Sequence, residues 1–201
     1  MRTLLTQNSK MKKATLVTMN FDLPLSTCIG AGKCKDNCYA KGFLYQMDNV
    51  INKHKWNLEN SKENDFHKKM DAEIKFFKTN KGLQAVRIHS SGDFYNREYL
   101  SKWLTIADMN PDITFYAYTK SVPLFINQSL PDNFRVIFST GGKYDKLIEA
   151  HNLRSCSVVE SYDDNAVTSD DDDSKIVLTN ANIQLKLRKI RKPNMKQKGV
   201  A

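Results

Sequence analysis

The chain has 201 residues, of which 40% are hydrophobic and 26% are charged, and its formal net charge is +9. This composition is that of an ordinary globular protein of one domain with tails. No apolar run reaches the roughly 18 residues that a membrane-spanning helix needs, and the first residues lack the apolar core of a signal peptide. We therefore expect a cytoplasmic protein with no membrane partner.

The positive charge is concentrated at the end of the sequence. The last sixteen residues contain seven basic residues and no acids, so the preceding residues carry a net charge of only +2. The basic residues are Lys186, Arg188, Lys189, Arg191, Lys192, Lys196 and Lys198. A basic tail of this kind can bind nucleic acid through its phosphates, or it can simply be a solvated end.

The first half of the chain predicts one strand, one loop and two helices. Residues 14–21 alternate and are rich in β-forming residues, which predicts a strand. A loop with one proline and two glycines follows. Apolar residues then recur at helical spacing from about Asp36 to Leu58, and again over residues 66–77.

The second half alternates strands with helices. We expect strands at 83–89, 113–118, 134–138 and 156–159, helices near 100–107, 122–127 and 145–151, and one last strand at 175–179. This order predicts an α/β fold with a largely parallel sheet. Right-handed crossovers would curl that sheet into an open or partial (β/α) barrel; an open doubly wound sheet is the alternative.

The domain organisation follows from this pattern. Residues 1–180 are expected to form a single α/β domain, and residues 181–201 a basic C-terminal tail. The acidic stretch that begins at Asp163 lacks the ligand spacing and central glycine of a calcium loop, which favours a solvated loop.

Three of the four cysteines lie close together in the sequence. Cys28 and Cys34 are separated by five residues, and Cys34 and Cys38 by three. In a reducing compartment, a cluster of cysteines indicates a metal site rather than disulfides. Thiolates are soft ligands that suit zinc or an iron–sulfur cluster. The five-residue gap is unlike the pairs typical of zinc sites, so we favour an iron–sulfur cluster over zinc and over three unligated thiols.

The fourth cysteine, Cys156, lies at the start of a predicted strand. It is our candidate for the fourth ligand of a four-iron (4Fe-4S) cluster, and a buried, inert cysteine is the alternative. Without it, three thiolates suit a three-iron (3Fe-4S) cluster, or a four-iron cluster with one open iron.

Polar residues follow the predicted strand at 83–89. In parallel α/β folds, sites form at the carboxyl ends of the strands, and the cysteine loop belongs to the same edge. Gly92 permits a close backbone approach or a tight turn. Asp93 could cap a helix, contact a ligand or the cluster, or do neither. His89 could contact a cluster, bind iron or be a satisfied histidine at this edge. The other histidines, on predicted helices, receive no role.

Three motifs resemble the bacteriophage "gene product eighty-eight" family. They are Cys28-Ile-Gly-Ala-Gly-Lys-Cys34-Lys-Asp-Asn-Cys38-Tyr-Ala40, Arg87-Ile-His-Ser-Ser-Gly-Asp-Phe-Tyr95 and Phe115-Tyr-Ala-Tyr-Thr-Lys120. The resemblance covers about Leu25 to Glu160. It implies a phage protein that acts in the infected bacterial host and carries a cluster.

The same layout is distantly similar to radical S-adenosylmethionine enzymes. That resemblance implies that Ser91, Gly92 and Asp93 could bind this cofactor, although the cysteine gaps here are five and three instead of three and two. Three hypotheses result. The first is a redox or cluster-dependent protein, with an electron donor or a host protein as partner. The second is a radical S-adenosylmethionine enzyme, and the third is a binding module for nucleic acid or a host protein with a structural cluster.

Overall fold

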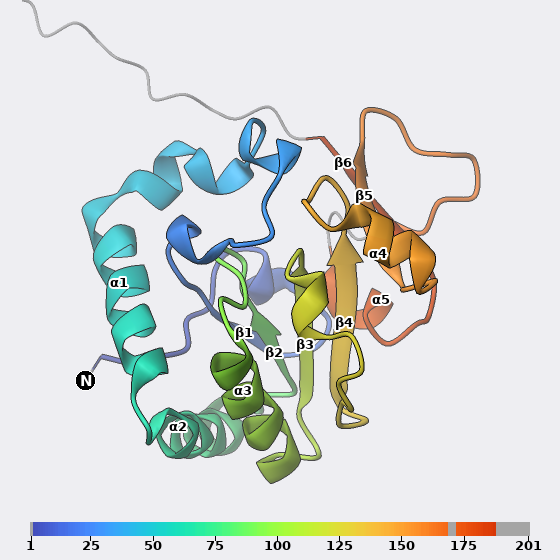
Figure 1. The fold of residues 1–201 in the computed structure, drawn as a ribbon. Helices are drawn as coiled ribbons and strands as arrows, with labels where there is room; N and C mark the ends of the chain where they lie inside the picture. Colours follow the sequence, from blue (N-terminus) through green and yellow to red (C-terminus); the bar gives the residue numbers. More distant parts are fainter. Residues whose placement is uncertain (1, 169–171, 188–201) are drawn as a thin grey trace, which may run out of the picture.

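A single parallel sheet organises the structure. The computed structural model describes residues 2–168 and 172–187, and in this part of the chain six strands lie side by side in their sequence order. They are β1 (Thr18–Phe21), β2 (Ala85–Ile88), β3 (Thr114–Thr119), β4 (Phe134–Ser139), β5 (Ser155–Val159) and β6 (Ile183–Lys186). All neighbours are parallel, and the sheet curls into a half-barrel (Figure 1). The predicted α/β class and partial barrel are therefore confirmed.

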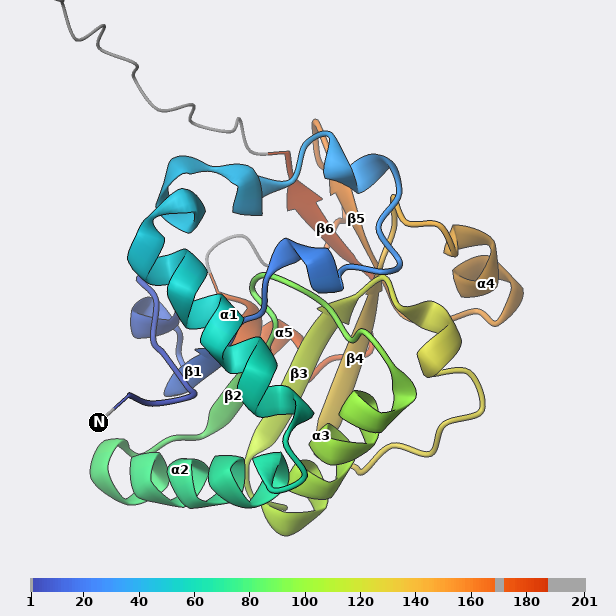
Figure 2. The ribbon, with the colours of Figure 1, turned by 60° about the vertical axis from the view of Figure 1, so that its left-hand side comes forward.

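Helices α1 (Asp48–Lys62), α2 (Phe66–Lys81) and α3 (Arg97–Met109) lie on one side of the sheet (Figure 2). Four buried apolar side chains of α2 lie three or four residues apart, as an amphipathic helix requires, and Asp71 is the one buried acid among them. Gly82 ends α2 with φ of +65°, and its N–H donates to the carbonyls of the last helical turn, which is the usual left-handed helix ending.

The main hydrophobic core fills the space between these helices and the sheet. Trp103 of α3 is fully buried, with its ring 5.4 Å from that of Phe21 and 5.7 Å from that of Phe66. Large side chains of this kind each contribute on the order of 2 kcal/mol by leaving water. Aromatic packing therefore joins α3 to β1 and to α2.

A smaller hydrophobic cluster covers the opposite face of the sheet. Its buried members are Ala85, Tyr116, Ile137, Cys156, Val177 and Ile183. Short helix α5 (Asp173–Ile176) and the residue that follows it lie against this face. The hydroxyl of Tyr116 also donates to the sulfur of Met11, at 3.7 Å, so the N-terminal segment contributes to the cover.

Two sequence-based expectations differ from the structure. The helix expected from about Asp36 begins at Asp48, and short 3-10 turns, interrupted by extended Gly42, precede it. The strand expected at 175–179 is replaced by α5, whereas Ile183–Lys186 forms β6. Ile183 pairs with Cys156 in the sheet, so β6 lies within the segment expected as the basic tail. The rest of the predicted basic tail, beyond Leu187, lies outside the described residues.

Across residues 2–168 and 172–187, the structure contains no helix that is both long enough and apolar enough to cross a membrane.

Candidate functional site

The cysteine loop, residues 28–38, lies over the carboxyl ends of the strands (Figure 2). Ala31 forms an antiparallel bridge with Gly142, in the turn after β4. The N–H of Cys34 donates to the carbonyl of Gly141 at 3.1 Å, and the N–H of Lys143 donates to the carbonyl of Gly30 at 2.9 Å. Backbone hydrogen bonds therefore fix the loop to the turn after β4.

Two glycines allow the loop to approach the strand ends this closely. A Cβ atom added to Gly30 would lie 2.1 Å from the carbonyl oxygen of Lys120. A Cβ atom on Gly32 would lie 2.9 Å from the carbonyl carbon of Gly142. Real Cβ atoms do not approach backbone atoms so closely, so the close fit depends on glycine at position 30 above all.

Asp93 joins the ends of β2 and β3 beneath the loop. Its carboxylate accepts hydrogen bonds from the hydroxyl of Thr119 at 2.5 Å, and from the N–H groups of Lys120 and Phe94 at 2.9 and 2.8 Å. Its own N–H donates to the hydroxyl of Thr27, at 3.1 Å. Burial raises the pKa of Asp93, and the hydrogen bonds oppose that shift.

Two further carboxylates support neighbouring parts of the same edge. Asp22, directly after β1, accepts hydrogen bonds from the N–H groups of Ser90 and Ser91, at 2.6 and 3.1 Å. Asp145, at the start of α4 (Asp145–Ala150), accepts from the two N–H groups of residues 141–142, at 2.8 and 2.9 Å. Carboxylates that accept backbone hydrogen bonds hold loops firmly, so the turns that face the cysteine loop are themselves well supported.

The three loop cysteines are half-buried free thiols. Burial above all, together with negative charge on Asp93, Cys38 and Cys34, raises the pKa of Cys28 to about 12, while Lys120 opposes the shift. Three thiolates could therefore be held here only with positive charge between them.

In the part of the chain that the structure describes, no three His, Cys, Asp or Glu side chains are grouped closely enough to hold a single metal ion. A zinc ion would draw its sulfur ligands to within about 4 Å of one another, because each Zn–S bond is about 2.3 Å long. A cluster of several irons holds its cysteines further apart, since the irons and sulfides lie between them. The described residues therefore offer no ready site for a single metal ion.

Cys156 lies in β5 and is buried in the smaller hydrophobic cluster, with 2% of its surface exposed. It pairs with Ser139, the last residue of β4, because β5 begins where β4 ends. Cys156 is therefore level with the carboxyl ends of the preceding strands, although it stands near the start of its own. Its role as a ligand stays a prediction.

The segment Ser91–Asp93 is closely packed against the start of the cysteine loop. The carbonyl of Ser91 accepts from the N–H of Leu23 at 2.9 Å. Gly92 has φ of +83°, and a Cβ atom there would lie 2.5 Å from the Cβ of Leu23. The glycine is thus required by contacts within the chain, and binding of S-adenosylmethionine by these residues stays a prediction.

His89 points into the main core. Its Nε2 lies 2.8 Å from the hydroxyl of Tyr99, and its ring centre is 4.7 Å from that of Phe94. Burial lowers the pKa of His89 to about 3, so the side chain is neutral at pH 7. Asn96, and not Asp93, caps helix α3, because its side chain accepts from the N–H of Tyr99 at 2.8 Å.

Comparison with known proteins places the chain in a family. The family model "Gene product 88" matches residues 2–199. The chain belongs to the gene product 88 family. It is also 33% identical, over 61 residues, to the "Gene 88 protein" of Mycobacterium phage L5; this match covers 29% of the chain and 26% of the phage L5 protein. No solved structure matches the chain.

These matches support the resemblance to a bacteriophage family, and they give no support to the likeness to radical S-adenosylmethionine enzymes. The chain spans about a quarter of the curated phage relative in its match. Family membership therefore identifies neither an activity nor a cofactor for this chain.

Sequence analysis overlooked a buried polar group beside the cysteine loop. His54 of α1, to which it gave no role, has its Nε2 4.0 Å from the carboxylate of Asp22. The side-chain amide of Asn57 donates to the carbonyl of Asp22 at 2.9 Å. Burial raises the pKa of Asp22 and lowers that of His54. The place of Asp22, directly after β1, was the available signal, whereas nothing in the helix pattern indicated His54.

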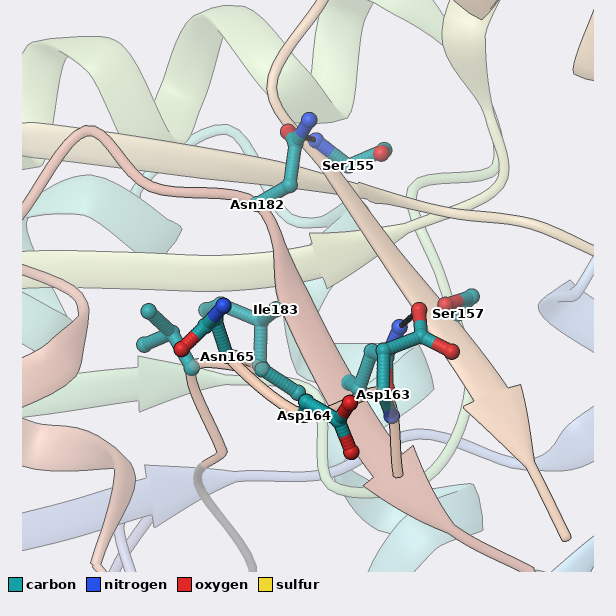
Figure 3. Close-up of a pocket in the computed structure, with 10 residues that line it drawn as sticks. Ser155, Ser157, Asp163, Asp164, Asn165, Asn182 and Ile183 are labelled. Carbon is teal, nitrogen blue, oxygen red and sulfur yellow. Dashed lines mark hydrogen bonds between the residues drawn. The ribbon is translucent and has the colours of Figure 1, made fainter. Parts of the chain in front are cut away.

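A hollow of about 520 Å³ lies beside β5 and β6, where residues 163–167 pass the two strands (Figure 3). Ser155 and Ser157 line it, and side chains alternate along a strand, so they face away from Cys156. Asp163 and Gln184 also line the hollow, and the N–H of Asp163 donates to the side chain of Gln184 at 3.0 Å. No cysteine is among its lining residues, so we do not connect it with the cysteine loop.

Proposed function

We propose that this phage protein holds an iron–sulfur cluster on Cys28, Cys34 and Cys38, with Cys156 as the fourth thiolate, and has a redox or other cluster-dependent role. The observation that supports the proposal best is the seating of the cysteine loop. Three half-buried thiols lie on one loop whose backbone is fixed to the strand ends. A fixed backbone of this kind would help to orient the cysteine side chains as ligands.

A bound cation would have to offset the charges around the loop if its three thiols act as ligands. The thiol of Cys28 lies within electrostatic reach of two other thiols and of the buried Asp93 carboxyl. Without a cation, this environment strongly disfavours thiolates. Thiols used only as small apolar groups would gain nothing from such neighbours, whereas bound iron would offset their charge.

The register of β5 supports Cys156 as the fourth ligand. Its pairing with Ser139 brings it level with the strand ends over which the cysteine loop lies. A four-iron cluster bound by four thiolates would supply one-electron transfer. The protein would then exclude water from one side of the cluster and orient the thiolates.

The alternative is a radical S-adenosylmethionine enzyme, which requires an iron that no cysteine binds. Ser91–Asp93 are the residues that would have to meet the cofactor, but the carboxylate of Asp93 already accepts three hydrogen bonds within the chain. We therefore place the cluster protein ahead of the radical enzyme.

Anaerobic purification tests the proposal. We expect brown protein with broad absorption near roughly 400 nm, and matching amounts of iron and sulfide. Replacement of Cys28, Cys34 or Cys38 by serine should each abolish or degrade the cluster. Colourless protein with stoichiometric zinc, or three serine variants that all retain full iron, would contradict it.

Cys156→Ser decides between the cluster protein and its alternative. If Cys156 is a ligand, this variant should turn the electron paramagnetic resonance signal of a four-iron cluster into that of a three-iron species, or make the cluster sensitive to oxygen. An unchanged iron count and spectrum would show that Cys156 is a core residue. Binding of S-adenosylmethionine, with Asp93→Asn as the test variant, would then become the decisive measurement.

A further inference from the structure

Large apolar side chains are exposed next to the cysteine loop. Tyr39, Phe43, Leu44 and Met47 have 49, 53, 70 and 41% of their surface exposed; we call these four residues the 39–47 patch. They follow Cys38 directly in the chain and occupy the short 3-10 turns before α1, which cross the top of the molecule in Figure 2. Apolar groups gathered in this way on a surface mark a contact site for another molecule.

The turns that carry the patch are fixed to the domain. The hydroxyl of Tyr39 donates to the carbonyl of Ser90, and the ring of Tyr39 packs edge-on against that of Tyr45, 5.8 Å away. Ala40 is buried, and its carbonyl accepts from the side chain of Gln46 at 3.3 Å. Since these inward contacts hold the turns, the outward apolar groups form a defined surface.

The charge around the patch is positive. Between Ile29 and Asp48, the exposed basic residues are Lys33, Lys35 and Lys41 and the exposed acids are Asp36 and Asp48, which leaves a net charge of +1 around the patch. An apolar centre with a basic rim is complementary to an acidic protein surface, which it can attract from a distance. A single strand of nucleic acid could stack on Tyr39 and Phe43, but Leu44, the most exposed of the four, offers no stacking surface.

From these observations we propose that the 39–47 patch docks an acidic electron-carrier protein. This inference rests on the proposed function, because an electron carrier requires a redox group beside the patch. Position supports it, since Cys38 directly precedes Tyr39, the first residue of the patch. The small area suits a short-lived contact, as is usual between redox partners.

Binding of an acidic plant-type ferredoxin to the full-length chain tests this proposal, first at about 20 mM and then at about 200 mM salt. We expect micromolar affinity that weakens with salt. The basic tail could also cause salt dependence, so the variants decide. Leu44→Asp should weaken binding by about tenfold, whereas the control Phe76→Asp, at an exposed position (57%) on α2, should not. In a second pair of variants, Lys41→Glu beside the patch should weaken binding, whereas its control Lys68→Glu on α2 should not.

A parallel measurement follows the rate at which reduced ferredoxin reduces the cluster, and it should fall with binding in Leu44→Asp. Absence of binding, or equal effects of Leu44→Asp and Phe76→Asp, would overturn the docking surface. It would also be overturned if a single-stranded oligonucleotide bound the patch in place of the ferredoxin. Failure of the proposed function would appear separately, as protein that lacks iron and sulfide before any partner is added.

Discussion

On the helix-covered side of the sheet, Trp103, Tyr99 and Phe21 are buried side chains that contact one another through their rings. At the carboxyl ends of the strands, the contacts are instead made by backbone. Glycines of the cysteine loop touch the carbonyls of the next turn, and the carboxylates of Asp22 and Asp93 accept N–H groups. The first region depends on the volume of its side chains, and the second on the absence of side chains at particular positions.

The largest effect should come from the core. Trp103→Ala removes a fully buried indole, and we expect it to lower the free energy of unfolding by about 3–5 kcal/mol. Phe76→Ala removes an exposed ring from the same helical layer, and it should change that free energy by less than about 0.5 kcal/mol. Urea unfolding of both variants measures the difference. Similar losses would mean that the aromatic packing carries little of the stability.

The core is also the part of the fold that the sequence predicts well. The apolar spacing of α2, and the alternation of β3 between Phe115 and Tyr116, reflect faces that are buried in the structure. The same criterion fails before Asp48. There Phe43, Leu44 and Met47 have helical spacing but are exposed. Extended Gly42 and short 3-10 turns take the place of the helix that the spacing predicts.

The site was predictable only where residues adjoin one another in the sequence. Spacing identified the loop of Cys28, Cys34 and Cys38, and the rule of strand ends placed it at the correct edge. The pairing of Cys156 with Ser139 depends on the stagger of the curled sheet, and the proximity of His54 to Asp22 depends on how α1 crosses that edge. Neither of these two contacts can be predicted from residues that are close together in the sequence.

At the edge of the sheet, adding one methyl group at Gly30 should lower the free energy of unfolding more than removing the exposed ring of Phe76 does. Gly30→Ala places a Cβ atom 2.1 Å from the carbonyl oxygen of Lys120. We expect a loss of about 1–3 kcal/mol, together with reduced iron per chain after anaerobic purification. In the control Gly82→Ala the added methyl group meets open space, and the strain at φ of +65° costs about 1 kcal/mol. That variant should keep its iron. Full iron content in Gly30→Ala would refute the proposed seating of the loop.

His89 links the two regions and should make stability depend on pH. Its pKa falls from 6.5 in the unfolded chain to about 3 in the folded protein, because burial disfavours the charged ring. Below pH 6.5 the unfolded state binds a proton that the folded state does not, so this group lowers stability as the pH falls towards 3. At pH 5 its share is about 2 kcal/mol.

His89→Asn removes this titration, and asparagine tolerates the left-handed φ of +68° found at this position. We expect the variant to be less stable than the parent at pH 7, since packing is lost, but to lose about 2 kcal/mol less between pH 7 and pH 5. Urea unfolding at the two pH values gives the comparison. Parallel pH dependences would mean that His89 is accessible to protons in the folded state.

The smallest expected effect distinguishes the roles of Asn96 and Asp93 at the start of α3. Asn96 accepts from the N–H of Tyr99 at the start of α3, so Asn96→Ala should cost about 1 kcal/mol, and Asn96→Asp should cost little. Asp93 does not cap the helix, because its carboxylate contacts Thr119 and Lys120 of the neighbouring strand end. Amide hydrogen exchange at Tyr99 should therefore accelerate in Asn96→Ala and stay unchanged in Asp93→Asn, whose effect should appear at the Lys120 amide. If Asp93→Asn accelerated exchange at Tyr99 as strongly, the carboxylate would support α3 directly, and the division between helix-covered core and strand-end edge would have to be redrawn at that residue.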